Sequence, residues 1–439
     1  MKLWLDGQCF QSGSRRRGIG RYALSWIRAL AGEGAELVLS LNAAIPGDLG
    51  AIEEQLRRDV PGLSIRHWHG IAEAGLAFTG ATERRRVSER VLDLHVGAIA
   101  PDAAICLSPF ESMSQPIVPF RPGPAFARPG LAILYDFIPH RMPDDYLKTA
   151  KDRAAYAGLV KSLRVFDGFL AISAFAAAET RAILGTGSVT NLSAGIAPDW
   201  LAGTVKPRQP GAPFTLLYVG ALDPRKNVGS CLEALQRVRQ QGGPPFRFEV
   251  HGAYAVEEGE ALRGQARRLG LAEEDLVLAG PFRDEDLVSI YRRADLVIQP
   301  SLMEGFGLTA LEAMACGVPV LAARAGALPE VVGLDEALFD PRDPAELAGR
   351  ILALMRDPDL WERHARHGLA RAPEFTWTRS AREGLAAIGA IAARKPAPPS
   401  VQAEEDALFE AVVAEAETLS HGNLARLLAL NAPKDPGGR

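Results

Sequence analysis

The sequence predicts an α/β protein made of two doubly wound, Rossmann-like domains, and three observations lead to this prediction. The chain has 439 residues, which is more than one hydrophobic core normally supports, so two domains are expected. Short apolar runs alternate with longer amphipathic stretches along the chain, which is typical of parallel sheets covered by helices. This alternation is interrupted at 206–213, where three prolines and a glycine precede a new strand.

The expected strands are short runs rich in Val, Ile and Leu. In the first half they are 3–5, 36–41, 103–107, 131–135, 168–172 and 189–192. The helices expected between them show amphipathic periodicity and are 20–31, 83–96, 146–165 and 174–184. The second half repeats the pattern, with strands near 215–219, 247–251, 276–278, 296–298 and 319–321.

Five segments are expected along the chain. They are a first Rossmann-like domain at 1–205, a hinge linker at 206–213, a second Rossmann-like domain at 214–375, a helix at 376–394 that packs back toward the first domain, and a Pro-rich linker with a helical tail at 395–439. The tail is expected to be either a packing element or a docking element for a protein partner.

Composition excludes several classes of protein. The 49 basic and 53 acidic residues give a formal net charge of −4, so a nucleic-acid partner is not expected. The four cysteines lie far apart, which predicts neither a disulfide framework nor a zinc site. No signal peptide and no apolar run of about 18 residues is present. We therefore expect a cytoplasmic protein, with peripheral contact to the inner face of the cell membrane left open.

The most informative segment is 300–319, PSLMEGFGLTALEAMACGVP. It follows a predicted strand, and doubly wound folds bind ligands at the carboxyl edge of the sheet. Gly305 and Gly307 allow a close approach of the backbone to a ligand, and 309–316 reads as a helix whose N-terminus favours anions. Glu312 falls among apolar residues of that helix, so its carboxylate needs a hydroxyl or cationic partner.

A second segment, 217–227, reads as a strand, a loop and a helix start, and its sequence is LYVGALDPRKN. Arg225 and Lys226 place positive charge where the helix dipole disfavours it. That conflict favours a functional role over an ordinary surface pair.

Two further patterns have weaker functional interpretations. Residues 18–23 match the loose dinucleotide fingerprint G-x-G-x-x-A, but the strand before them is followed by a long loop and the expected ribose-binding acid is missing, so nicotinamide binding is not expected. Residues 284–286 contain a D-x-D, which we interpret as helix capping by Asp286 rather than as a metal site. The basic run at 15–17 is interpreted equally well as a mobile loop or as a clamp on an anionic ligand.

On these motifs the sequence resembles glycosyltransferase family 4, also called group 1, a family of retaining enzymes with the GT-B architecture. Its signature of two glutamates separated by seven residues is matched by Glu304 and Glu312. The resemblance covers roughly 1–390 and is strongest over 214–335. The Tyr-Asp pair within 134–139 looks like a subgroup of bacterial surface-polysaccharide enzymes, often mannosyltransferases that use GDP-mannose.

The resemblance also implies roles for single residues. The first domain would face the acceptor and the second would bind the nucleotide sugar. Glu304, Lys226 and Arg225 would act in catalysis, with the two basic groups on the donor diphosphate. Donor-binding residues would be Gly18, Gly20, Gly305, Phe306, Gly307, Leu308, Thr309 and Glu312. Candidates for contact with the sugar or the acceptor are Arg17, Arg21, Tyr135 and Asp136. Ala221 departs from relatives with a polar residue there, which removes one phosphate contact.

We therefore expect a retaining hexosyltransferase, preferably of mannose from GDP-mannose, that acts on a growing glycan or lipid-linked glycan in surface-polysaccharide assembly. No cofactor and no metal ion is expected, since the nucleotide-sugar donor is a substrate. Two alternatives remain open at this point: a GT-B sugar-nucleotide epimerase, and an inert assembly scaffold that docks through 400–439.

Overall fold

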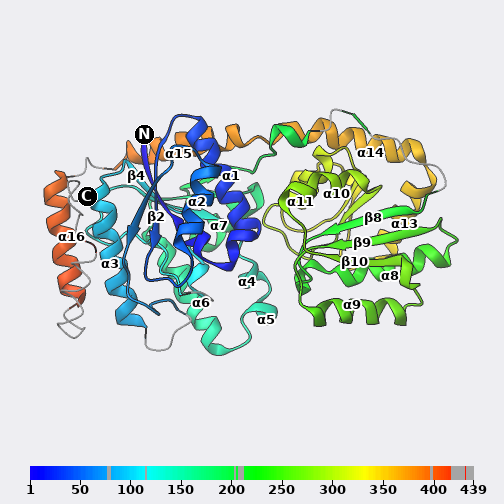
Figure 1. Ribbon diagram of the computed structural model, residues 1–439, viewed down its shortest axis with the longest axis horizontal. Coiled ribbons are helices and arrows are strands. Elements are labelled where there is room, and N and C mark those ends of the chain that lie inside the picture. Colours follow the sequence, from blue (N-terminus) through cyan, green and yellow to red (C-terminus); the bar gives the residue numbers. More distant parts are fainter. Residues whose placement is uncertain are drawn as a thin grey trace. The chain divides into compact units, whose positions relative to one another are not determined.

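The structure is a computed structural model that describes residues 1–76, 81–113, 116–201, 204–205, 212–395, 399–416 and 431 (Figure 1). The chain divides into two compact units. The first consists of Met1–Ile172, Ala176–Leu192 and Thr378–Arg439, and the second of Ser173–Phe175 and Ser193–Trp377.

The first unit contains, within the described residues, a seven-stranded sheet in which all neighbouring strands pair in parallel, in the order β3-β2-β1-β4-β5-β6-β7. Its strands are β1 (Lys2–Asp6), β2 (Glu36–Asn42), β3 (Ser64–Trp68), β4 (Ala103–Cys106), β5 (Gly130–Leu134), β6 (Gly168–Ala171) and β7 (Val189–Asn191). Strands β1, β2, β4, β5 and β6 are nearly continuous buried runs, as expected for a parallel sheet covered on both faces, whereas the edge strands β3 and β7 are only partly buried.

The second unit contains a six-stranded parallel sheet of order β10-β9-β8-β11-β12-β13, again counted over the described part of the chain. Its strands are β8 (Phe214–Val219), β9 (Phe246–His251), β10 (Leu276–Gly280), β11 (Leu296–Gln299), β12 (Val320–Ala323) and β13 (Leu338–Phe339). In both sheets the strand order reverses once in the middle. Together they confirm the predicted α/β, doubly wound class.

Helices connect the parallel strands in both units. Those of the first unit are α1 (Gly18–Gly32), α2 (Leu49–Asp59), α3 (Thr82–Ile99), α4 (Ile138–Arg141), α5 (Pro143–Tyr146), α6 (Ala150–Ser162), α7 (Ala174–Leu184), α15 (Trp377–Ala392) and α16 (Val401–Ala416). Those of the second unit are α8 (Val228–Gln240), α9 (Val256–Arg268), α10 (Leu287–Arg293), α11 (Leu308–Ala315), α12 (Leu328–Val332), α13 (Pro344–Arg356) and α14 (Pro358–Arg371). In the part of the chain that is described, no helix is both long enough and apolar enough to span a bilayer.

The two compact units divide at 192/193. The hinge linker predicted at 206–213 stays a prediction, because its residues 206–211 are outside the described residues. The segment that follows the division belongs with the second unit because Ile196 pairs in parallel with Thr376 and the Trp200 ring packs on Tyr291, with centroids 6.1 Å apart. These contacts join residues distant in sequence, so no local composition marks them.

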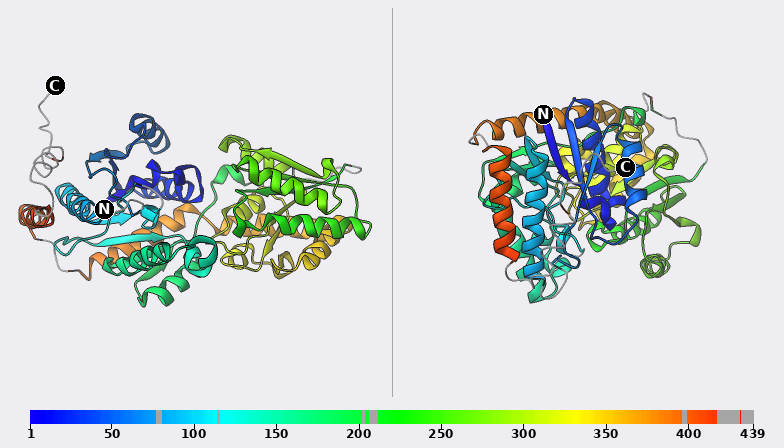
Figure 2. Two further views of the ribbon diagram at one scale, coloured as in Figure 1. Left: turned by 90° about the horizontal axis from the view of Figure 1, so that it is seen from below. Right: turned by 60° about the vertical axis from the view of Figure 1, so that its left-hand side comes forward.

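The C-terminal elements return to the first unit. In α15, the backbone carbonyl of Ser380 accepts a hydrogen bond from Trp26 Nε1 at 3.4 Å. The tail helix α16 lies along α3, as Figures 1 and 2 both show. A Cβ on Gly97 would come within 2.4 Å of the Leu408 side chain, and Glu404 forms a buried ion pair with Arg128 at 2.9 Å. The first helix of the tail therefore packs on its own chain, and 417–439, apart from Asn431, lies outside the described residues.

Candidate active site

Charged side chains of the second unit gather where its strand order reverses, between β8 and β11. These two strands pair only at Leu216 and Leu217, whereas β8 pairs with β9 along its whole length. The loops that follow β8 and β11 therefore diverge at the carboxyl edge of the sheet, which is where open α/β sheets bind ligands. The first loop carries Arg225 and Lys226, and the second carries Glu304.

The three predicted catalytic side chains meet in one cluster, in which Glu304 is buried and Arg225 and Lys226 are half-buried. Lys226 Nζ lies 2.5 Å from Glu304 Oε1, and Arg225 Nη1 lies 3.3 Å from Glu304 Oε2. Ser301 Oγ and Gln299 Nε2 also donate to Glu304 Oε1, at 2.7 and 2.9 Å. Both carboxylate oxygens therefore have partners, as a buried charge requires.

The electrostatics of this cluster keep the Glu304 carboxylate ionised. Burial alone would raise the pKa of Glu304, but the charges of Lys226 and Arg225 and the hydrogen bonds from Lys226 and Ser301 outweigh burial and lower that pKa to about 2. Burial lowers the pKa of Lys226, and the charge of Glu304 opposes that change. At neutral pH Glu304 therefore accepts hydrogen bonds and has no proton to donate.

The lowered pKa of Glu304 predicts a loss of stability in acid. The folded value of about 2 is below its ordinary value of 4.5, so the stabilisation is complete above pH 4.5 and is lost as the pH falls toward 2. Between pH 6 and pH 3, this carboxyl should account for a fall of about 2 kcal/mol in the free energy of unfolding. Urea unfolding at the two pH values measures the fall. In Glu304→Gln the free energy of unfolding should fall by about 2 kcal/mol less over this range. An equal fall in both proteins would contradict the lowered pKa of Glu304.

Asn227 holds the two loops in register, a role that the sequence analysis missed. It adopts the left-handed conformation, with φ of 55°, between the short 3-10 helix Pro224–Lys226 and α8. Its side-chain Nδ2 donates to the carbonyls of Pro300 and Pro341 at 3.2 and 2.8 Å. The backbone N–H of Leu302 also donates to the Arg225 carbonyl at 2.7 Å. An asparagine directly before a predicted helix was the available signal, because asparagine tolerates this conformation.

Gly326 supports the backbone of Glu304 from the loop after β12. Its φ is +56°, and a Cβ there would lie 2.2 Å from the Glu304 carbonyl oxygen. The next residue, Ala327, donates its N–H to that same oxygen at 3.0 Å. The glycine therefore permits a close approach that fixes the Glu304 backbone.

Gly326→Ala is expected to destabilise the second unit by roughly 3 kcal/mol, because it adds both a left-handed alanine and a backbone clash. The displaced Glu304 should also lower activity. Thermal unfolding measures the first effect. Gly349→Ala is the matched control, because Gly349 lies in α13 with no atom near its Cβ position, so the substitution should stabilise by about 1 kcal/mol. Equal stabilities for the two variants would contradict the role of Gly326.

The glycine-rich segment before α11 has the backbone predicted for it. Gly307 is the N-cap of α11 with φ of +105°, and a Cβ there would lie 2.6 Å from Leu328. Gly305 is buried, and the buried Phe306 ring packs edge-on against Phe375 with centroids 5.9 Å apart. Leu308 and Thr309 are half-buried at the N-terminus of α11. Their donor contacts remain predictions.

Glu312 has the hydroxyl partner that its burial demanded. It is 3% exposed, and Tyr291 in α10 donates its hydroxyl to Glu312 Oε2 at 2.8 Å. This bond orients the carboxylate from the neighbouring helix. Binding of ribose hydroxyls by Glu312 remains a prediction.

The candidate residues from the first half of the chain lie in the first unit. Gly20 packs on the backbone of Arg15, because a Cβ there would be 2.3 Å from its carbonyl oxygen. The Tyr135 hydroxyl donates to the Ile19 carbonyl at 3.5 Å, so the Gly18–Gly20 turn and β5 come together. Asp136 Oδ1 accepts from the Ile138 N–H at 3.0 Å, at the start of α4.

The remaining candidates and one missed residue surround the same turn. Arg17 is the exposed N-cap of α1, and Arg21 is half-buried one turn further on. Glu111 was missed, although it accepts hydrogen bonds from the hydroxyls of Ser12 and Ser14, both at 2.8 Å. It thereby fixes the loop that leads to Gly18. Only the contact of distant loops reveals this role.

The D-x-D segment corrects one detail of the sequence interpretation. Asp286 occupies the N-cap of α10, but its side chain makes no capping bond. Its carboxylate instead accepts from Arg283 Nε at 3.1 Å. A nearby guanidinium competes for the carboxylate because a charge-assisted bond is stronger than one to a backbone amide.

Residues 204–370 match the family model described as glycosyl transferases group 1. Among curated proteins, the chain is 27% identical over 400 residues to the serotype-specific mannosyltransferase WbdA of Escherichia coli, an alignment covering 87% of this chain and 47% of that protein. It is 37% identical over 161 residues to the O-antigen chain mannosyltransferase B of Escherichia coli, covering 37% of this chain and 42% of the relative. The chain thus spans less than half the length of these relatives.

Solved structures resemble most of this chain in fold. The crystal structure of Anabaena Alr3699/HepE in complex with UDP and glucose superimposes with a TM-score of 0.64 at 19% identity, over 89% of this chain and 99% of that one. The glycosyltransferase WaaG, involved in lipopolysaccharide biosynthesis, gives a TM-score of 0.58 at 16% identity, over 88% and 98%. These likenesses confirm the predicted GT-B fold class.

Proposed function

We propose that the chain is a retaining glycosyltransferase that moves a hexose from a nucleotide-diphosphate sugar to a glycan, in keeping with the match of residues 204–370 to the glycosyl transferases group 1 model. The observation that carries the proposal is the meeting of Lys226 and Arg225 with Glu304 at the carboxyl edge of the second sheet. A cationic pair at this edge suits a diphosphate, and an ionised carboxylate suits the hydroxyls of a sugar.

In the proposed reaction, the bond between the anomeric carbon and the diphosphate oxygen breaks while the acceptor hydroxyl oxygen bonds to the same face of that carbon. The hydroxyl proton passes to the departing diphosphate. Lys226 and Arg225 stabilise the negative charge that develops on this leaving group. Glu304, with a pKa of about 2, cannot serve as a general acid at neutral pH, so a leaving group that accepts the proton itself fits the site.

Mannose from GDP-mannose is the proposed donor group, and the growing chain of a surface polysaccharide is the proposed acceptor. Support comes from two relatives named as mannosyltransferases, one of them for the O-antigen chain. The proposal places the reaction in the cytoplasm, at the inner face of the cell membrane, without a metal ion or cofactor.

A direct test incubates the purified chain with GDP-mannose, UDP-glucose, UDP-galactose or ADP-glucose and a mannose-terminated acceptor. GDP-mannose should raise the thermal midpoint most, because a ligand of the folded state stabilises it by mass action. NMR of the product should show the anomeric configuration of the donor. Conversion of the donor without acceptor would instead indicate an epimerase, and failure of every donor to bind would favour the scaffold alternative.

A further inference from the structure

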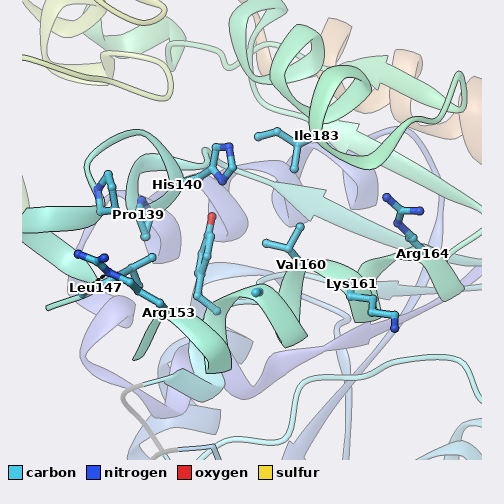
Figure 3. A pocket seen from close by; sticks show the side chains of 11 residues that line it. Pro139, His140, Leu147, Arg153, Val160, Lys161, Arg164 and Ile183 are labelled. Atoms are coloured by element: carbon cyan, nitrogen blue, oxygen red, sulfur yellow. Dashed lines mark hydrogen bonds between the residues drawn. The ribbon is translucent and has the colours of Figure 1, made fainter. Parts of the chain in front are cut away.

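A pocket of about 590 Å³ lies in the first unit, between α4, α5, α6 and the end of α7 (Figure 3). Much of its wall is apolar and includes Pro139, Leu147, Val160 and Ile183. The volume falls within the range of about 300–1,000 Å³ that small-molecule sites occupy. None of the predicted catalytic or donor-binding residues lines it.

The rim of this pocket is basic. Figure 3 shows Arg153 at one end of the pocket and Lys161 with Arg164 at the other, with Val160 between them. Among the described residues that line the pocket, none is acidic. Asp144 outside it pairs with Arg153 at 3.1 Å, which leaves the end with Lys161 and Arg164 as the stronger site for an anion. Both of these side chains are exposed.

Tyr156 adds a polar group to the pocket wall. Its side chain is buried, with 4% exposure, and its ring stacks on Phe110 with centroids 5.7 Å apart. Its hydroxyl lies near the backbone of His140, another residue that lines the pocket. Tyrosine therefore contributes both apolar ring surface and one polar group to the wall.

From this combination we infer that the pocket binds the apolar chain of a lipid phosphate, with Lys161 and Arg164 on the phosphate. The inference rests on the proposed function, because the ligand would be the lipid carrier of the acceptor glycan. The lining begins at Pro139, in the same helix that follows the predicted acceptor residue Asp136. A bilayer-inserting surface would instead be convex, with protruding apolar side chains, whereas this site is concave and suits a single chain.

Binding to the full chain is tested with dodecyl phosphate, dodecyl maltoside and inorganic phosphate. Dodecyl phosphate should bind about tenfold more tightly than either of the others, because it alone engages both the wall and the rim. The double variant Lys161→Glu/Arg164→Glu should weaken its binding by at least about tenfold, and Ala157→Phe, which fills the pocket from an exposed position of α6, should do the same.

Lys151→Glu is the matched control, since Lys151 is exposed on α6 and does not line the pocket. Its binding of dodecyl phosphate should stay within about twofold of the unmodified chain. Equal weakening by Lys151→Glu would show that general surface charge is responsible, and binding of inorganic phosphate as tight as that of dodecyl phosphate would show that the apolar wall is not used. Either result would overturn the inference.

Two further arms identify the source of the lipid phosphate. A mannobiose linked to farnesyl diphosphate and the same mannobiose as its methyl glycoside serve as acceptors. The Lys161→Glu/Arg164→Glu variant should raise KM about tenfold for the first acceptor and leave KM unchanged for the second.

Binding to vesicles of phosphatidylcholine and phosphatidylglycerol tests whether the same residues bind a membrane instead. If the double variant lost vesicle binding but kept dodecyl phosphate binding, the basic residues would serve a bilayer and the inference would fail. Absence of transfer to both acceptors, with dodecyl phosphate still bound, would reject the proposed function and leave the lipid-phosphate site standing.

Discussion

Replacing Lys226 with methionine is expected to lower kcat/KM for glycosyl transfer about 10³-fold while the second unit stays folded. Methionine keeps a long unbranched side chain and removes the cation. In the structure this half-buried ammonium lies 2.5 Å from Glu304 Oε1, at the sheet edge where the donor diphosphate is proposed to lie. A preorganised cation in a site of low dielectric stabilises developing charge far more than one in water does. The fold survives because Glu304 keeps its contacts with Arg225, Ser301 and Gln299.

Steady-state kinetics with the preferred donor measure this loss. Arg237→Gln is the control, because Arg237 is an exposed cation near the end of α8, the helix that begins directly after the Lys226 loop. It should leave kcat/KM within about twofold of the unmodified protein. A folded Lys226→Met protein that turned over at more than about a tenth of the normal rate would remove Lys226 from the mechanism.

The fold class was predictable because fully buried parallel strands are short, continuous apolar runs. β5 and β11 are of this kind, and every residue of each is buried. Two edge strands were missed because neither forms such a run. β3 carries the exposed Arg66 and His67, and β13 is only two residues long.

The start of a helix was less predictable where a capping box between side chains and backbone determines it. The stretch 146–165 was expected to be one helix, whereas the structure breaks it before α6. Thr149 and Asp152 form a capping box there, with Asp152 N–H donating to Thr149 Oγ1 at 3.1 Å and Thr149 N–H donating to the Asp152 carboxylate at 3.0 Å. The T-x-x-D pattern was available in the sequence as a signal for that start.

The candidate site was only partly predictable. Convergence of Glu304 with Lys226 could be expected because their loops follow the two strands that flank the reversal of strand order. The contacts of Gly326 with the Glu304 backbone and of Tyr291 with Glu312 could not be predicted. Each depends on the packing of a loop or helix that is distant in sequence. For the same reason the partner of Glu312 was predicted as a chemical type but not as a residue.

Glu304→Gln is expected to lower kcat/KM about 10²-fold and to destabilise the second unit by about 3 kcal/mol. Glutamine keeps the size of the side chain and can still bond to Ser301 and Gln299, but it removes the negative charge. The Lys226 ammonium, whose side chain is 16% exposed, would then lie next to Arg225 without its counterion. Urea unfolding and steady-state kinetics measure the two effects separately.

The double variant Glu304→Gln/Lys226→Met distinguishes a structural role of the pair from a chemical one. Removing both charges eliminates the unpaired buried cation, so the free energy of unfolding should return to within about 1 kcal/mol of the unmodified protein. Activity should stay at least as low as in Lys226→Met, because stability does not restore the cation that the leaving diphosphate requires. Recovery of activity together with stability would mean that the ion pair only holds the two loops together, and the site would then need another source of positive charge.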